Sequence, residues 1–249
     1  MPGRTGWVPL AALVGAQICY PLTGGGVRAG LTVLAVVLGW LLSVSHALLT
    51  RGVRSAAGLV AAGTLGGFAV EALGVATGFP FGAYDYSGAL GPRLLGVPLI
   101  IPLAWTWMAW PAWLAASRLT RRRSGRILVG AVGLASWDLF LDPQMVAEGY
   151  WTWRDPVPAL PGVPGVPIGN YLGWLGVAIL LMTALAFAET GPRERGTDAP
   201  VLALWFWTYA SSVLAHAVFL RLPGSAAWGG VVMGAVVLPQ AVQVGRRAP

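Results

Sequence analysis

Long apolar runs, separated by short loops that carry arginine, constrain this chain more than any other feature. A helix needs roughly 20 apolar residues to cross a hydrocarbon core of about 30 Å. Only 10% of the residues are charged and the mean hydropathy is +0.69, whereas soluble domains carry about 25% charged residues. We therefore predict an all-α, polytopic membrane helix bundle that forms a single domain over residues 1–249. The expected spans are 7–22, 29–49, 57–78, 97–117, 127–147, 169–188, 201–219 and 227–244.

The distribution of arginine predicts the orientation of these about eight helices. Basic residues are enriched in cytoplasmic loops, and twelve arginines fall on one side of the predicted spans against four on the other. We thus expect a cell-membrane protein with both termini in the cytoplasm. The first span also fits a signal peptide, so it is either retained or cleaved. The twelve arginines are Arg4, Arg51, Arg54, Arg118, Arg121, Arg122, Arg123, Arg126, Arg193, Arg195, Arg246 and Arg247, and the four are Arg28, Arg93, Arg154 and Arg221.

The composition excludes several kinds of chemistry. All 16 basic residues are arginine, and without lysine a retinal Schiff base cannot form. The single Cys19 excludes an intrachain disulfide and a cysteine-ligated metal cluster. The arginines lie in loops between apolar runs, which indicates a topology signal and not nucleic-acid binding. The basic segment 118–126 is interpreted in the same way, with anionic lipid or a partner as the alternative ligand.

Two loops on the predicted outer side, 79–96 and 148–168, are rich in proline, glycine and aromatic residues. This composition differs from that of a flexible linker, so we expect both loops to fold back against the bundle. Alternatively, Trp151 and Trp153 belong to an aromatic belt at the membrane surface.

Ionisable residues within membrane spans usually face the bundle interior and mark a functional site. Glu71 shares its helical face with Gly67, Gly74 and Gly78, and small residues let a neighbouring helix approach closely. Glu71 is therefore expected to point into a helix contact. A purely structural hydrogen bond is the alternative.

Asp138 and Asp142 have the i, i+4 spacing that places two carboxyl groups on one helical face. Two like charges one turn apart in low dielectric repel each other, so we expect one carboxyl to hold a proton while the other is ionised. Pro143 follows directly and predicts a broken helix that lines a cavity. Alternatively, Asp142 simply lies at a helix end that is exposed to water.

The remaining polar residues extend this site. His46 and His216 fall near opposite ends of their spans, too far apart to share a metal. By depth, Glu71, Asp138, Asp142, Asn170 and His216 all lie in the outer half of their spans. We predict that they surround one cavity beneath the two aromatic loops.

A buried cavity with carboxyl and aromatic groups suits acid-catalysed chemistry on a hydrocarbon. A neutral carboxylic acid can protonate an alkene, and Trp and Tyr rings stabilise the resulting cation through cation–π attraction. A second carboxylate can then take a proton from the attacking water.

Three segments, at 78–105, 136–153 and 165–174, resemble the carotenoid hydratase family of the CruF type. They read GFPFGAYDYSGALGPRLLGVPLIIPLAW, SWDLFLDPQMVAEGYWTW and GVPIGNYLGW. The resemblance implies a carotenoid biosynthesis enzyme, a hydro-lyase that adds water to the terminal C1=C2 double bond of an acyclic carotenoid ψ-end. It also implies a lipid-soluble substrate within the membrane and no organic cofactor. The residues offer no cluster of histidines for a metal, so we expect none.

The roles of the individual residues are our own hypotheses. Asp138 is predicted to be the general acid, assisted by Asp142, and Glu71 to orient or deprotonate the water. Asn170 and His216 are expected to hold water. The residues expected to bind substrate are Phe81, Tyr84, Asp85, Tyr86, Trp137, Tyr150, Trp151, Asn170 and His216.

Two other functions fit parts of the pattern. The Asp138 and Asp142 spacing also suits a membrane prenyltransferase that binds a magnesium diphosphate. Glu71 and Asp138 could instead relay protons in a transporter. The oligomeric state is left open by the sequence, because its GxxxG pairs suit contacts within or between chains.

Overall fold

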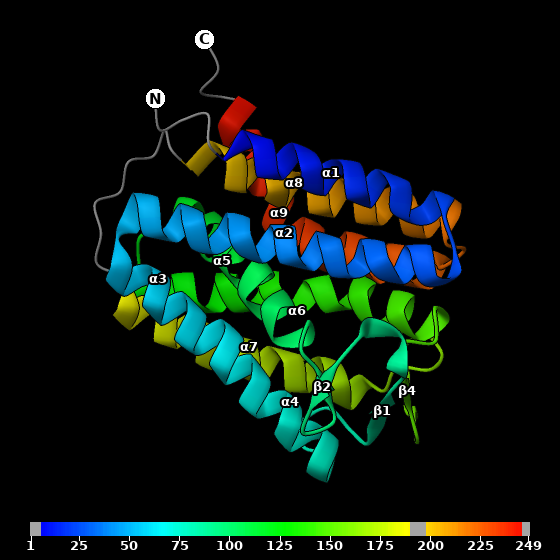
Figure 1. Cartoon of the computed structure of the whole chain (residues 1–249). Coiled ribbons are helices and arrows are strands. Elements are labelled where there is room, and N and C mark those ends of the chain that lie inside the picture. Colours follow the sequence, from blue (N-terminus) through cyan, green and yellow to red (C-terminus); the bar gives the residue numbers. More distant parts are fainter. Residues whose placement is uncertain (1–5, 190–197, 246–249) are drawn as a thin grey trace.

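The computed structural model describes residues 6–189 and 198–245, and it is a bundle of long helices (Figure 1). The elements in chain order are α1 (Trp7–Cys19), η1 (Tyr20–Leu22), α2 (Gly25–Arg51), α3 (Val53–Leu59), η2 (Val60–Leu65), α4 (Gly66–Thr77), β1 (Tyr84–Tyr86), η3 (Gly88–Leu90), β2 (Arg93–Leu94), β3 (Val97–Pro98), α5 (Ile101–Leu119), α6 (Arg123–Ala147), β4 (Trp151–Trp153), α7 (Ile168–Ala188), α8 (Ala199–Leu214), η5 (Ala215–Phe219) and α9 (Pro223–Gly245).

Helices occur at all eight predicted spans, which confirms the all-α membrane bundle. Within the described residues, six helical stretches are long and apolar enough to cross a membrane: 25–51, 53–77, 123–147, 168–188, 199–219 and 223–242. The stretch 7–22 is a shorter apolar helix. Helix α5 is buried along nearly its whole length, from Pro102 to Ala116, as expected of a helix that is apolar on all sides.

Helices α5 and α6 form the centre of the bundle. Figure 1 shows α1, α2 and α8 on one side of them and α4 and α7 on the other. Helix α6 runs through Pro143 without interruption, so the predicted break in this helix is wrong. The irregular turns lie elsewhere, in the π-helical segments η2 and η5, which continue α3 and α8.

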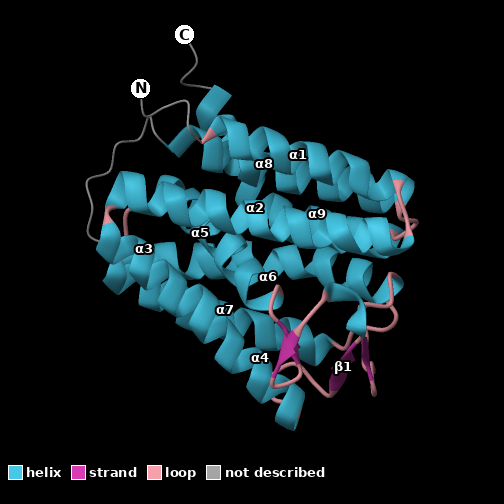
Figure 2. Ribbon diagram, in the orientation of Figure 1, coloured by secondary structure: helices cyan, strands magenta, loops and turns pink. Residues whose placement is uncertain are grey.

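The two aromatic loops pair with each other at one end of the bundle, which we call the ribbon end (Figure 2). Strand β1 is antiparallel to β4, with Tyr84 opposite Trp153 and Tyr86 opposite Trp151. We call this two-stranded pair the ribbon. The tryptophans are 6% and 8% exposed at 151 and 153, so neither belongs to a lipid-facing belt. The prediction that these loops fold against the bundle is confirmed.

A buried ionic network closes the opposite end of the bundle. Asp198 accepts hydrogen bonds from Arg51 at 2.8 Å and from Arg118 at 3.0 Å. Glu189 accepts one from Arg126 at 2.7 Å. Arg118 and Arg126 therefore bind acidic groups of this chain, which the interpretation of segment 118–126 as a topology signal did not anticipate.

The predicted orientation in the membrane stays a prediction. Several of the arginines behind it lie outside the described residues, namely Arg4, Arg193, Arg195, Arg246 and Arg247.

The ionic network makes a testable prediction about stability. Asp198→Asn removes the charge that Arg51 binds at 2.8 Å in a buried site, and breaking a buried ion pair costs about 3–5 kcal/mol. We expect a clearly lower melting midpoint in detergent micelles. Asp85→Asn is the matched control, because Asp85 is exposed where it pairs with Arg154, and exposed pairs contribute little. Equal melting midpoints for the two variants would contradict this account.

Candidate active site

Glu71 lies on α4 beneath the ribbon, on a face formed by glycines. A Cβ atom at Gly67 would come within 2.9 Å of the Trp105 ring, and one at Gly74 within 2.8 Å of the Tyr84 hydroxyl. The missing side chains therefore leave room for two aromatic residues that reach Glu71. As predicted, the glycines on this face allow a close contact at Glu71, made by α5 and by the ribbon.

Three hydrogen-bond donors surround the Glu71 carboxyl group. Tyr84 and Tyr86 donate to Oε2 at 2.6 and 2.8 Å, and Trp105 Nε1 donates to Oε1 at 3.0 Å. Indole can only donate, and a carboxylate accepts at both oxygens. Burial and the neighbouring Glu71 charge raise the pKa of both tyrosines, so they remain donors. Glu71 thus has the surroundings of an ionised carboxylate.

Asp138 and Asp142 form a carboxyl pair on α6. Asn170, near the start of α7, donates from Nδ2 to Asp138 Oδ2 at 2.8 Å and also to Asp142 Oδ2. The two carboxyl groups therefore converge on one amide group. Two carboxylates so close together in a dry interior would repel each other, so we expect one of the two to hold a proton. Trp151 Nε1, from the ribbon, donates to Asp142 Oδ1 at 3.1 Å.

A single cavity joins these groups. Its wall includes Glu71, Asp142, Asn170 and His216. These four residues come from four different helical stretches, and the sequence predicted that they lie at one depth. Asp138 is fully buried, and it does not belong to the described lining. Asp142 is therefore the member of the pair that faces the cavity, and Asp138 lies behind it.

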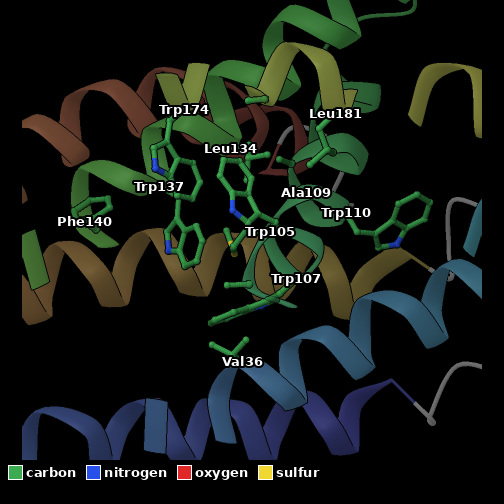
Figure 3. Close-up of a cluster of buried hydrophobic side chains, with 14 of the residues drawn as sticks. Val36, Trp105, Trp107, Ala109, Trp110, Leu134, Trp137, Phe140, Trp174 and Leu181 are labelled. Atoms are coloured by element: carbon green, nitrogen blue, oxygen red, sulfur yellow. The ribbon is translucent and has the colours of Figure 1, made fainter. Parts of the chain in front are cut away.

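Indole rings form one wall of this cavity (Figure 3). Trp105 and Trp174 are stacked with ring centroids 3.8 Å apart. Trp137 stands edge-on to Trp174 at 6.3 Å and to Trp107 at 5.6 Å. The row leads from Glu71 towards Val36 on α2, so an apolar ligand in the cavity would meet electron-rich rings along its length.

Strand alternation decides which side chains of the ribbon face the site. Successive side chains of a strand point to opposite faces, so Tyr84 and Tyr86 reach the site while Asp85 faces outward. There Arg154 donates to both Asp85 oxygens at 2.7 and 2.8 Å, and these bonds lower the pKa of Asp85. The structure does not bring Asp85 to the cavity.

The other predicted substrate-binding residues are placed differently from one another. Phe81, Trp137 and Trp151 line the cavity, whereas Tyr150 is buried outside its described lining. His216 lines the cavity, but its ring nitrogens lie 2.8 Å from the Ser212 carbonyl and 3.0 Å from the Phe140 carbonyl. Both nitrogens face the backbone, so His216 has no ring nitrogen left to hold water. His46 contacts Trp110 and Asp198, and Asp198 belongs to the ionic network at the opposite end of the bundle.

Three indoles of the wall were missed from the sequence. Trp105 and Trp107 lie in a tryptophan-rich helix that is buried on every side, so periodicity could not select the rings that face the cavity. Trp174 follows Asn170 by four residues and thus shares its helical face. That spacing was an available signal.

Comparison with known proteins now identifies the family. The family described as "Carotenoid biosynthesis protein" matches residues 31–239. The chain belongs to this family. This carotenoid biosynthesis protein is also 35% identical over 146 residues to a bisanhydrobacterioruberin hydratase of Haloarcula japonica. These findings confirm the resemblance to carotenoid hydratases of the CruF type seen in the sequence.

The alignment with the hydratase covers 56% of this carotenoid biosynthesis protein and 48% of the relative. The chain thus matches about half the length of that curated relative. No solved structure matches the chain.

The tyrosine contacts to Glu71 make a prediction about the ribbon. Hydrogen bonds to charged groups contribute about 1.5–3 kcal/mol, so Tyr84→Phe or Tyr86→Phe should raise amide hydrogen exchange in β1 and β4 by about tenfold or more. Tyr171→Phe is the matched control, because the Tyr171 hydroxyl is buried without a hydrogen-bond partner among the described residues. Unchanged exchange in both ribbon variants would show that Glu71 does not anchor the ribbon.

Proposed function

We propose that this protein is a carotenoid hydratase that adds water to the terminal C1=C2 double bond of an acyclic ψ-end. The observation that carries the proposal is one cavity bordered by a pair of carboxyl groups, by a third carboxyl group that accepts three hydrogen bonds and by a wall of indoles. The name of the related hydratase supports it, as does the family. The substrate would be a lipid-soluble carotenoid within the membrane.

The acid is assigned to the Asp138 and Asp142 pair. Because Asp142 faces the cavity and Asp138 is buried behind it, Asp142 delivers the proton to C2 and Asp138 shares the charge that remains. This exchanges the roles expected from the sequence. Asn170 donates to both carboxyl groups, so it stabilises the pair most strongly after the proton has left.

Protonation at C2 leaves a tertiary cation at C1. The cation is stabilised by the faces of nearby indoles, since a cation over an aromatic ring gains about 0.5–2 kcal/mol. The negative charge of Glu71 adds a longer-range attraction across the cavity. Both are fixed before the reaction, so little reorganisation accompanies the change in charge.

Water then attacks C1 and must lose a proton. Glu71 is the base, because three donors stabilise its ionised form and it lies in the same cavity wall. The proton returns to the Asp138 and Asp142 pair through cavity water, so one turnover consumes water and no net proton. The roof formed by the ribbon keeps bulk solvent from reaching the cation.

The other functions considered fit this geometry less well. A diphosphate needs cationic side chains, and the described lining of the cavity contains no arginine, in a chain that has no lysine. A proton-coupled transporter would have no need of an indole wall beside the acid pair. Activity in detergent micelles, without any ion gradient, would separate the enzyme from the transporter.

The acid assignment predicts the outcome of expression in cells that accumulate lycopene or a C50 anhydro-carotenoid. The wild-type chain should yield a pigment heavier by one or two waters, as seen by chromatography and mass spectrometry. Asp142→Asn, Asp138→Asn and Glu71→Gln should each abolish this product, while the outward-facing Asp85→Asn retains it. Hydration by Asp142→Asn would remove the pair from its role, and a prenylated product would overturn the proposed function.

The indole wall predicts a graded series at Trp137. A phenyl ring retains part of the cation–π attraction and an aliphatic side chain retains none, so turnover should fall in the order Trp, Phe, Leu. We expect about 2- to 30-fold between the extremes, as the size of one cation–π contact implies. Substrate affinity should change less than turnover, because the cation exists only during the reaction. Equal turnover for Trp137→Phe and Trp137→Leu would contradict a role of this ring in stabilising charge.

A further inference from the structure

The two central helices each contain an interior proline, Pro111 in α5 and Pro143 in α6. Proline has no N–H, so the carbonyl four residues earlier loses its helical donor. The two carbonyls concerned are those of Trp107 and Leu139. In the hydrocarbon region an unsatisfied backbone group costs several kcal/mol, so each carbonyl needs a donor from elsewhere.

A buried serine of a neighbouring helix supplies the donor in both cases. Ser43 of α2 donates from Oγ to the Trp107 carbonyl at 2.9 Å, and Ser225 of α9 donates to the Leu139 carbonyl at 2.6 Å. Because the same pairing of an interior proline with a serine occurs twice, we treat each pair as one unit of the fold.

The hydrogen bond from Ser225 reaches the turn of α6 that carries the two aspartates. Leu139 and Phe140 belong to the single helical turn between Asp138 and Asp142, and the Phe140 carbonyl faces His216 Nε2 at 3.0 Å. The backbone that carries the carboxyl pair is thus held by side chains of η5 and α9. Without them, the turn loosened by Pro143 could widen and move Asp142 away from Asn170.

We propose that Ser225 is a positioning residue for the acid pair. Its hydroxyl replaces the N–H that Pro143 lacks, and so it holds the turn at the spacing in which both carboxyl groups contact Asn170. Ser225 touches no substrate atom in this account and acts through the Leu139 carbonyl. The expected effect of Ser225 on turnover rests on the proposed function. Its expected effect on the position of the two carboxyl groups does not.

A double-mutant cycle with Pro143 tests the proposal. Ser225→Ala should lower kcat about tenfold, with KM nearly unchanged, and should shift the pH–rate profile, since loss of one buried hydrogen bond has this magnitude. In Pro143→Ala/Ser225→Ala, residue 143 regains an N–H for the Leu139 carbonyl. The effect of removing the serine should therefore be at least threefold smaller in the Pro143→Ala background.

Ser43→Ala is the matched control, because it removes the same kind of hydrogen bond from the Pro111 unit. It should lower the melting midpoint as Ser225→Ala does and leave the pH–rate profile unchanged. A second readout is the infrared band of the protonated carboxyl pair in membranes, identified by its loss in Asp138→Asn or Asp142→Asn. Ser225→Ala should shift this band, and the double variant should restore it.

The outcomes separate this inference from the proposed function. If the wild-type protein hydrates carotenoid while Ser225→Ala keeps the pH–rate profile and the infrared band, the positioning role is wrong. It is also wrong if Ser225→Ala impairs folding and Pro143→Ala gives no rescue. If the wild-type protein hydrates nothing but the band shifts and is restored as expected, the proposed function fails and the positioning role stands.

Discussion

Polar groups inside this bundle depend on partners within the protein, since the surrounding hydrocarbon offers none. This constraint accounts for the main features of the structure. Glu71 has three donors, and Asn170 joins the two aspartates. At the opposite end, Asp198 and Glu189 each bind buried arginines. The bundle is held at both ends by such polar networks, and one of them also forms the candidate active site.

The ribbon connects the two acidic parts of the site. Tyr84 and Tyr86 reach Glu71, while Trp151 reaches Asp142. Since β1 and β4 are paired residue by residue, a movement of either strand would change the hydrogen bonds to both carboxyl groups. The roof is therefore part of the acid–base machinery as well as a barrier to solvent. The same three aromatic side chains provide the apolar surroundings that a carotenoid end group requires.

The spans and the members of the site could be largely predicted, because burial in a membrane restricts composition so strongly. Runs of apolar residues must be helices, and a carboxyl group within them must face inward. Such reasoning located Glu71, Asp138, Asp142 and Asn170. It failed where a contact joins distant segments, as for Asp85, which strand alternation turns outward. It also failed at Pro143, where a serine 82 residues later in the chain keeps the helix continuous.

By itself, then, the sequence determined the all-helical membrane fold, the approximate limits of the helices and the buried carboxyl groups Glu71, Asp138 and Asp142. The tertiary structure alone decided which carboxyl group faces the cavity, which indoles form its wall and which donors hold Glu71. The physical reason is the distance along the chain over which each property acts. Hydrophobic length and helical periodicity are local properties of the chain, whereas hydrogen-bond partners in a dry interior are chosen by packing between helices far apart in sequence. The chemistry of this protein depends on that second kind of contact.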